Sequence, residues 1–233
     1  MAELIAAIFL PLPLALVAAV AHLDRAVLFQ SLFHRPVFLA PLLGWMSGHL
    51  EAGVQVAMIS EFVSLLVPPT GADIPADEGG LAAITMLTLV LLHLPEPACI
   101  PLVLAVTLSV LPVLRNLEVL VRQGNERLAR FAEAELLAGR GVPFKRLVFA
   151  SMVSQILLYA LLYLVAALVV GAVVAVMWYS SDSLRQWAGG GALFVVLLVP
   201  VVGVLRAGHD LRALTRYGLA AGAAGVGFLL GGI

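Results

Sequence analysis

Ionisable side chains gather in one window of a chain that is otherwise strongly apolar. In the order of the chain they are Asp24, Arg25, Arg35, Glu51, Glu61, Asp73, Asp77 and Glu78. A charged group inside a bilayer costs several kcal/mol unless it faces a cavity or a partner. Prolines and glycines interrupt the same window, and irregular backbone at that depth is tolerated only where protein or a water-filled cavity surrounds it. We therefore expect this window to bind a polar substrate.

Two acids are the first candidates for substrate binding. Glu61 lies in an otherwise apolar, helix-compatible stretch, and its carboxylate could accept two hydrogen bonds from vicinal hydroxyls or shuttle a proton. Asp77 precedes a predicted helix over residues 78–92, where its side chain could cap the first amide groups. Asp77 could serve only as that cap, or could cap the helix and offer its second oxygen to a ligand.

Asp24 and Arg35 complete the predicted site. Asp24 could form an interfacial ion pair with the adjacent Arg25, and Arg35 could end a membrane segment or neutralise one of the acids. We expect no catalytic residue, metal or cofactor on this chain, because it contains neither an HExxH pattern nor a P-loop. The single cysteine, Cys99, also excludes an internal disulfide and a Cys-based metal site.

Composition places these groups in a membrane. The chain has 233 residues, of which 62% are hydrophobic and 12% charged, whereas soluble domains carry about 25% charged residues. A span needs about 20 apolar residues, so this length predicts an all-α, polytopic integral membrane protein with about six to eight transmembrane or re-entrant helices. We expect one membrane domain over residues 1–233. The net charge of −1, without a basic patch, gives no indication of nucleic-acid binding.

Apolar runs outline the expected helices. They cover residues 4–22, 36–67, 81–114, 147–178, 191–205 and 217–232. The second run is interrupted near Gly48 and the third at 95–97, so each could be a helix pair with a tight turn or a broken helix. We favour a re-entrant hairpin over 49–80, with proline-kinked ordinary helices as the alternative, and a simple interfacial turn at 95–97.

The segment 115–146 differs from the rest, because it holds seven of the thirteen Lys and Arg residues. Leucines recur there at helical spacing, which predicts an amphipathic helix. The positive-inside rule places this segment and the loop 206–216 in the cytoplasm. The segment could be a solvated interfacial helix or a docking surface for a cytoplasmic partner.

Four motifs resemble one known family in their order and spacing. They are Leu23-Asp24 followed by Phe33-His34-Arg35-Pro36; Pro41-Leu42-Leu43-Gly44 through Gly48 and Gly53 to Glu61; Gly71 and Asp77, ten and sixteen residues after Glu61; and Leu205-Arg206-Ala207-Gly208. Together they resemble the IIC permease subunit of the mannose/fructose/sorbose class of the bacterial phosphoenolpyruvate-dependent sugar phosphotransferase system.

The resemblance implies a transport role shared between several proteins. A IIC subunit pairs with a IID membrane subunit in the bacterial inner membrane, and the two move a hexose inward. Cytoplasmic IIA and IIB proteins supply the phosphate, and the IIC chain itself is not phosphorylated. The glycine- and alanine-rich C-terminal run would also suit an oligomer interface.

Three positions depart from the family pattern. His49 stands where the family has Asp, Leu66 where it has Gly, and Pro69 where it often has Asn. We therefore keep two hypotheses for the function of this chain. The chain could be a sugar-translocating IIC subunit, or a non-transporting IIC homologue with a regulatory or protein-interaction role.

Overall fold

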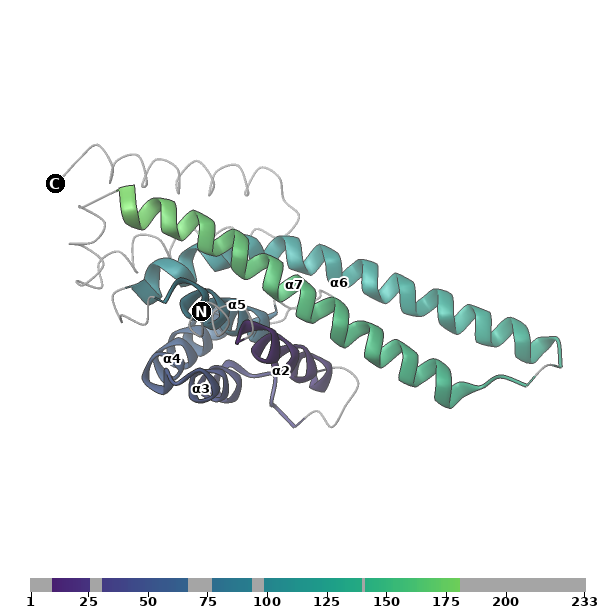
Figure 1. Ribbon diagram of the computed structural model, residues 1–233. Coiled ribbons are helices and arrows are strands. Elements are labelled where there is room, and N and C mark those ends of the chain that lie inside the picture. The colour runs from purple at the N-terminus through teal and green to yellow at the C-terminus, as the bar shows by residue number, and fades with distance from the viewer. Residues whose placement is uncertain (1–9, 26–30, 67–76, 94–98, 140, 181–233) are drawn as a thin grey trace.

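The computed structural model describes residues 10–25, 31–66, 77–93, 99–139 and 141–180. This part of the chain is helical throughout (Figure 1). Its helices are α2 (Pro11–Asp24), α3 (Pro36–Ser47), α4 (Leu50–Leu66), α5 (Glu78–Leu92), α6 (Ile100–Leu137) and α7 (Phe144–Ser180). The runs expected at 191–205 and 217–232, the loop 206–216 and the motif 205–208 lie outside the described residues.

A tight hairpin joins α3 and α4, which confirms that the run 36–67 is a helix pair. Gly48 ends α3 with φ +79°, a left-handed conformation that glycine adopts without steric cost. The two helices then approach closely, because a methyl group added at Gly53 would lie 2.6 Å from the carbonyl oxygen of Ala40. Gly44, Gly48 and Gly53, three glycines of the second motif, are therefore needed for this hairpin.

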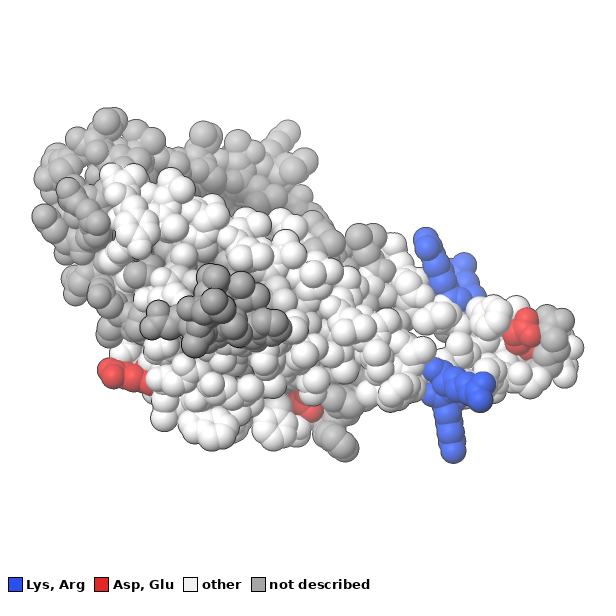
Figure 2. Space-filling model, viewed as in Figure 1, with Lys and Arg blue, Asp and Glu red and all other residues white. Residues whose placement is uncertain are grey.

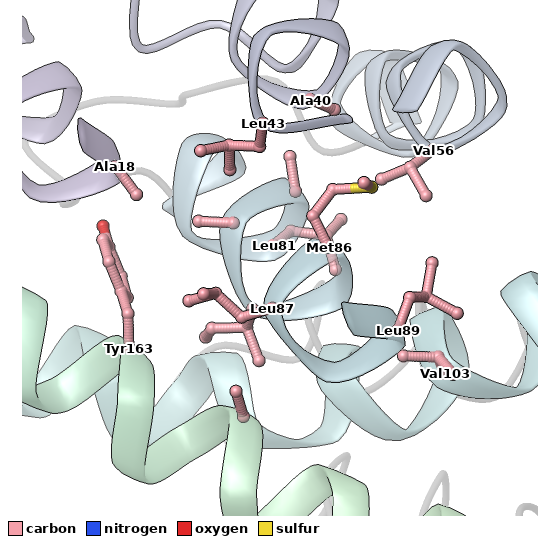
Figure 3. Close-up of a cluster of buried hydrophobic side chains, with 14 of the residues drawn as sticks. Ala18, Ala40, Leu43, Val56, Leu81, Met86, Leu87, Leu89, Val103 and Tyr163 are labelled. Atoms are coloured by element: carbon pink, nitrogen blue, oxygen red, sulfur yellow. The ribbon is translucent and has the colours of Figure 1, made fainter. Parts of the chain in front are cut away.

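Helix α5 lies at the centre of the fold. Residues 79–90 are all buried, and the helix contacts α2, α3, α4, α6 and α7. Figure 3 shows its side chains Leu81, Met86 and Leu87 among residues of the surrounding helices. A helix that is apolar on every side has to be buried. Its burial fixes the place of its N-terminus, and Asp77 is the cap there.

Helices α6 and α7 form a long antiparallel hairpin whose outer part extends beyond the short helices (Figure 1). The amphipathic segment expected at 115–146 is therefore the continuation of α6 rather than a separate helix. Ser151 donates a hydrogen bond to Asn125 Oδ1 at 3.0 Å and joins the two helices near the outer end. Charged residues gather on the same outer part (Figure 2).

The surface of α7 is apolar on the exposed side as well as on the buried side. Its exposed large apolar residues include Val148, Phe149, Val153, Leu157, Leu158, Leu161, Val165, Leu168, Val169, Val173 and Val176. A surface helix of a water-soluble protein is polar on its outer side, so this pattern indicates contact with lipid. By length and composition, α7 is the one helix among the described residues able to cross a membrane; α2, α3, α5 and residues 100–111 are shorter apolar helices.

Candidate functional site

The four residues predicted from the sequence all lie at or near ends of the short helices. Asp24 ends α2, Arg35 is the N-cap of α3, and Asp77 is the N-cap of α5. Glu61 lies in the last two turns of α4. The structure brings Arg35 and Glu61 into direct contact, whereas Asp24 and Asp77 each belong to a neighbouring group of contacts.

Arg35 holds two carboxylates. Its guanidinium donates to Glu61 through Nε at 3.2 Å and Nη2 at 2.7 Å, and its Nη1 lies 3.2 Å from Glu78 Oε2. Such a bidentate arrangement uses the planar geometry that only arginine offers. The neutralising role expected for Arg35 is thus confirmed, and Glu78 is an additional partner. With two acids and one base, the group carries a formal charge of −1.

Glu61 also receives hydrogen bonds from its surroundings. The backbone N–H of Val37 donates to Oε1 at 3.3 Å, and the Ser64 hydroxyl lies 3.4 Å from Oε2. Because that hydroxyl donates its one proton to the Glu61 backbone carbonyl at 2.7 Å, the carboxylate has three donors, two from Arg35 and one from Val37. The side chain remains 19% exposed, so it is reachable from the outside of the cluster.

Asp77 lies in a second, more buried group formed by α2, α5 and α7. Its Oδ1 accepts from the Gly80 backbone N–H at 2.9 Å, which confirms the predicted cap. Its Oδ2 accepts from the Tyr163 hydroxyl at 2.7 Å and lies 3.2 Å from His22 Nδ1. Since Tyr163 gives its proton to Asp77, the network assigns a proton to His22 Nδ1, which lies 3.0 Å from the tyrosine oxygen.

Arg25 connects this group to α6. Its Nη1 lies 3.9 Å from Asp77 Oδ1 and 3.9 Å from Glu118 Oε2, and Glu118 in turn accepts from Arg122 at 2.6 Å. Tyr159 stacks on His22 with ring centroids 3.7 Å apart. A series of polar contacts therefore runs from the end of α2 to the point where α6 becomes charged.

Asp24 organises the segment that leads into α3. Its Oδ1 accepts from the backbone N–H of Ser31 at 3.1 Å and the hydroxyl of Ser31 at 2.9 Å, and its Oδ2 accepts from the Phe33 N–H at 3.0 Å. His34 Nδ1 lies 3.7 Å from the same carboxylate. Burial lowers the pKa of His34, and the charges of Arg25 and Arg35 lower it further, whereas Asp24 raises it. Because the net effect lowers the pKa, His34 is neutral at neutral pH and this contact is not an ion pair.

The start of α5 packs directly against that segment. A methyl group added at Gly79 would lie 2.5 Å from the carbonyl oxygen of His34, so only glycine permits this approach. The backbone next to Arg35 is thereby held against the first turn of α5. This contact explains how Arg35 reaches both Glu61 on α4 and Glu78 on α5.

Sequence reasoning assigned no site role to five residues of these groups, of which only Glu78 was named in the ionisable window: His22, Tyr159, Tyr163, Glu78 and Glu118. The two tyrosines are four residues apart, and so lie on one face of a helix that is almost entirely aliphatic around them. This spacing was a usable signal. Glu118 lies four residues before Arg122, which is a local signal for their ion pair but not for the contact with Arg25. His22 gave no signal, because its partners lie far away in the chain; its contact with Tyr163 spans 141 positions.

The departure at His49 lies away from these contacts. His49 forms the turn between α3 and α4, where its N–H donates to the Gly44 carbonyl at 2.7 Å. Arg35 is at the opposite end of α3, about 18 Å away at 1.5 Å per residue. We call Arg35, Glu61 and Glu78 the Arg35 group. Having His49 in place of the family's Asp therefore removes no partner from this group. The Leu66 side chain, Pro69 and Gly71 lie outside the described residues.

One family matches most of the chain. The family described as the PTS system sorbose-specific IIC component matches residues 8–205, which include every helix described above. No curated protein and no solved structure gives a significant match. This family is a membrane family of the mannose class and works with other phosphotransferase subunits. On the extent of this match, the chain belongs to the sorbose-specific IIC component family of the sugar phosphotransferase system.

Proposed function

We propose that this chain is the membrane permease subunit that moves a hexose of the mannose, fructose and sorbose class inward. Partner subunits would couple phosphorylation of the hexose to this movement. The observation that carries the proposal is the Arg35 group, three charged side chains held at the ends of otherwise apolar helices in a chain of this family. Charged groups among apolar helices are costly, and a polar substrate gives them a function.

Within this group, we propose that Glu61 contacts sugar hydroxyls directly. Its side chain is 19% exposed, and a carboxylate is a strong acceptor for vicinal hydroxyl groups. Arg35 balances the charge of the acids, and Asp24 balances charge nearby while it shapes the approach to α3. A site built to pair a hydroxyl rejects compounds that lack it, so such contacts select among hexoses.

The proposed placement is a single, multi-pass domain in the bacterial inner membrane, with six to eight crossings or re-entrant helices. Helix α7 has 37 residues and is about 55 Å long, whereas a hydrocarbon core is about 30 Å thick. Part of the α6–α7 hairpin must therefore project. Its charged outer end, within residues 115–146, supports a cytoplasmic position, and the loop 206–216 would lie on the same side.

The proposed partners are a IID membrane subunit, cytoplasmic IIA and IIB phosphocarrier proteins, the hexose and the lipid bilayer, with an oligomeric assembly. The alternative is a non-transporting homologue with a regulatory or protein-interaction role. The altered positions His49, Leu66 and Pro69 favour that alternative. The remoteness of His49 from the Arg35 group favours transport.

The test is uptake of labelled mannose, fructose and sorbose by membrane vesicles that contain this chain and its IID partner. Glu61→Gln removes the charge but keeps the size of the side chain, so it should reduce uptake at least about tenfold without reducing membrane insertion. Glu51→Gln is the matched control, because Glu51 lies on the same helix and is exposed. Equal uptake by wild type and Glu61→Gln would disprove the role of Glu61.

A further inference from the structure

The carboxylates of the site differ in how much acceptor capacity they have left. An ionised carboxylate offers about four acceptor positions, two on each oxygen. Those of Glu61 receive three donors, two from Arg35 and one from the Val37 N–H. Those of Asp24 receive three, from Ser31 and Phe33. By this count, each of these two carboxylates has about one acceptor position left for a sugar hydroxyl.

Asp77 has little capacity left as well. Gly80 N–H, Tyr163 hydroxyl and His22 Nδ1 surround its two oxygens, and its side chain is only 10% exposed. Tyr163 itself is 1% exposed and cannot turn away without breaking the packing of α7. Of the two roles left open for Asp77, a cap alone or a cap that also offers its second oxygen to a ligand, these contacts favour the first.

Glu78 is different. Its Oε2 lies 3.2 Å from Arg35 Nη1, and Oε1 has no donor among the residues that the structure describes. The side chain is 22% exposed, more than that of Glu61 or Asp77. Glu78 thus combines an ion pair on one oxygen with a second oxygen to which none of the described residues donates.

We propose that Glu78 is the residue that accepts the hydrogen bond from a sugar hydroxyl most directly, and that Asp77 is a positioning residue that holds it there. This inference rests on the proposed transport of a hexose. Arg35 then serves as a shared support, which fixes Glu78 on one side and Glu61 on the other. The ligand class is a neutral polyol with at least one equatorial or axial hydroxyl able to donate to Oε1.

The Asp77 contacts explain how Glu78 is held. Glu78 is the first residue of α5, directly after the cap. Tyr163 and His22 hold one oxygen of Asp77 while the other oxygen caps the helix through Gly80, so the first turn of α5 is tied to α2 and α7. Loss of these bonds would loosen the backbone of Glu78 without removing any group that touches the sugar.

The experiment measures uptake by vesicles that contain the full chain with its IID partner. Labelled mannose, fructose and sorbose identify the transported hexose, and each monodeoxy derivative of that sugar is then tested. Glu78→Gln should raise the KM of the parent sugar about tenfold, because the acceptor loses its charge. One derivative lacks the hydroxyl that donates to Glu78. For that derivative, wild type and Glu78→Gln should have equal KM, because neither can form this hydrogen bond.

Two variants separate contact from positioning. Asp77→Asn keeps the helix cap but weakens the bonds from Tyr163 and His22, so it should impair uptake of the parent sugar and of every derivative alike. Glu126→Gln, an exposed carboxylate on α6, makes the same chemical change outside the site and should leave KM unchanged.

Each outcome bears on a different proposal. If wild type transports a hexose but Glu78→Gln has the wild-type KM, the role of Glu78 is refuted while transport stands. The assignment is reversed if Asp77→Asn, and not Glu78→Gln, takes up one derivative as well as wild type does. Asp77 would then be the residue that contacts the sugar. If wild type takes up none of the three hexoses with a complete set of partners, the proposed function fails and the role of Glu78 fails with it.

Discussion

Removal of the Tyr163 hydroxyl tests the buried contacts that hold α5 against α7. Tyr163→Phe keeps the ring in its packed position and deletes the charge-assisted 2.7 Å bond to Asp77 Oδ2. It also removes the 3.0 Å contact with His22 Nδ1, which stays 3.2 Å from Asp77 Oδ2. A hydrogen bond to a charged group contributes about 1.5–3 kcal/mol. Because Asp77 is nearly buried, no solvent replaces the lost donor at full strength. We therefore expect the free energy of unfolding to fall by about 2 kcal/mol.

The chain carries its own reporter for this measurement. Cys99 is the only cysteine, and it is buried in the core, so a thiol-reactive fluorogenic dye reads its exposure on heating. For a protein of this size, 1 kcal/mol corresponds to roughly 2–4 °C, which predicts a Tm about 4–8 °C below that of wild type.

The matched control is Tyr159→Phe. Tyr159 lies one turn earlier on the same helix, and its contact with His22 is made by the ring, which phenylalanine keeps. Its Tm should stay within about 2 °C of wild type, as for most changes that spare buried partners. Equal melting of wild type and both variants would refute the reasoning, since the Tyr163–Asp77 bond would then contribute nothing to stability.

Three further changes test other parts of the structure. Gly53→Ala places a methyl group against the backbone of α3 and should lower Tm by several degrees in the same thiol assay. Gly124→Ala, in open space on α6, should leave Tm equal or higher. Equal effects of the two variants would contradict the close approach of α3 and α4. Arg35→Lys should reduce hexose uptake about tenfold, because an ammonium lacks the planar fork that pairs with Glu61 through two N–H groups while a third nitrogen faces Glu78. Full uptake would show that the guanidinium is not required. Glu133→Cys in a Cys99→Ala background should react with an impermeant maleimide in inside-out vesicles only, and reaction in intact cells would place the hairpin outside.

The sequence predicted best those features that depend on neighbouring residues. The break near Gly48 predicted the α3–α4 turn, because a left-handed residue between two apolar runs is a local signal. The capping role of Asp77 followed from its place before an apolar helix. Arg35 was correctly expected to neutralise an acid, although two roles had been left open.

The sequence did not predict the features that depend on distant segments. The sequence left open whether Asp77 only caps the helix or also offers an oxygen to a ligand, because nothing local indicates its contacts with Tyr163 and His22. Glu78 drew little attention in the sequence, since an acid in the first turn of a helix is common. Its importance follows from Arg35, whose position depends on the packing of the segment 31–35 against α5.

The central claim, that this chain translocates a hexose, is tested most directly by phosphorylation of sugar inside sealed vesicles. The vesicles contain this chain and its IID partner, and the cytoplasmic phosphocarrier proteins and phosphoenolpyruvate are supplied on the cytoplasmic face. We expect at least one of mannose, fructose and sorbose to accumulate as its phosphate on that face, and Glu61→Gln to abolish most of the accumulation. An assembled wild-type complex that phosphorylates none of the three sugars would contradict the claim.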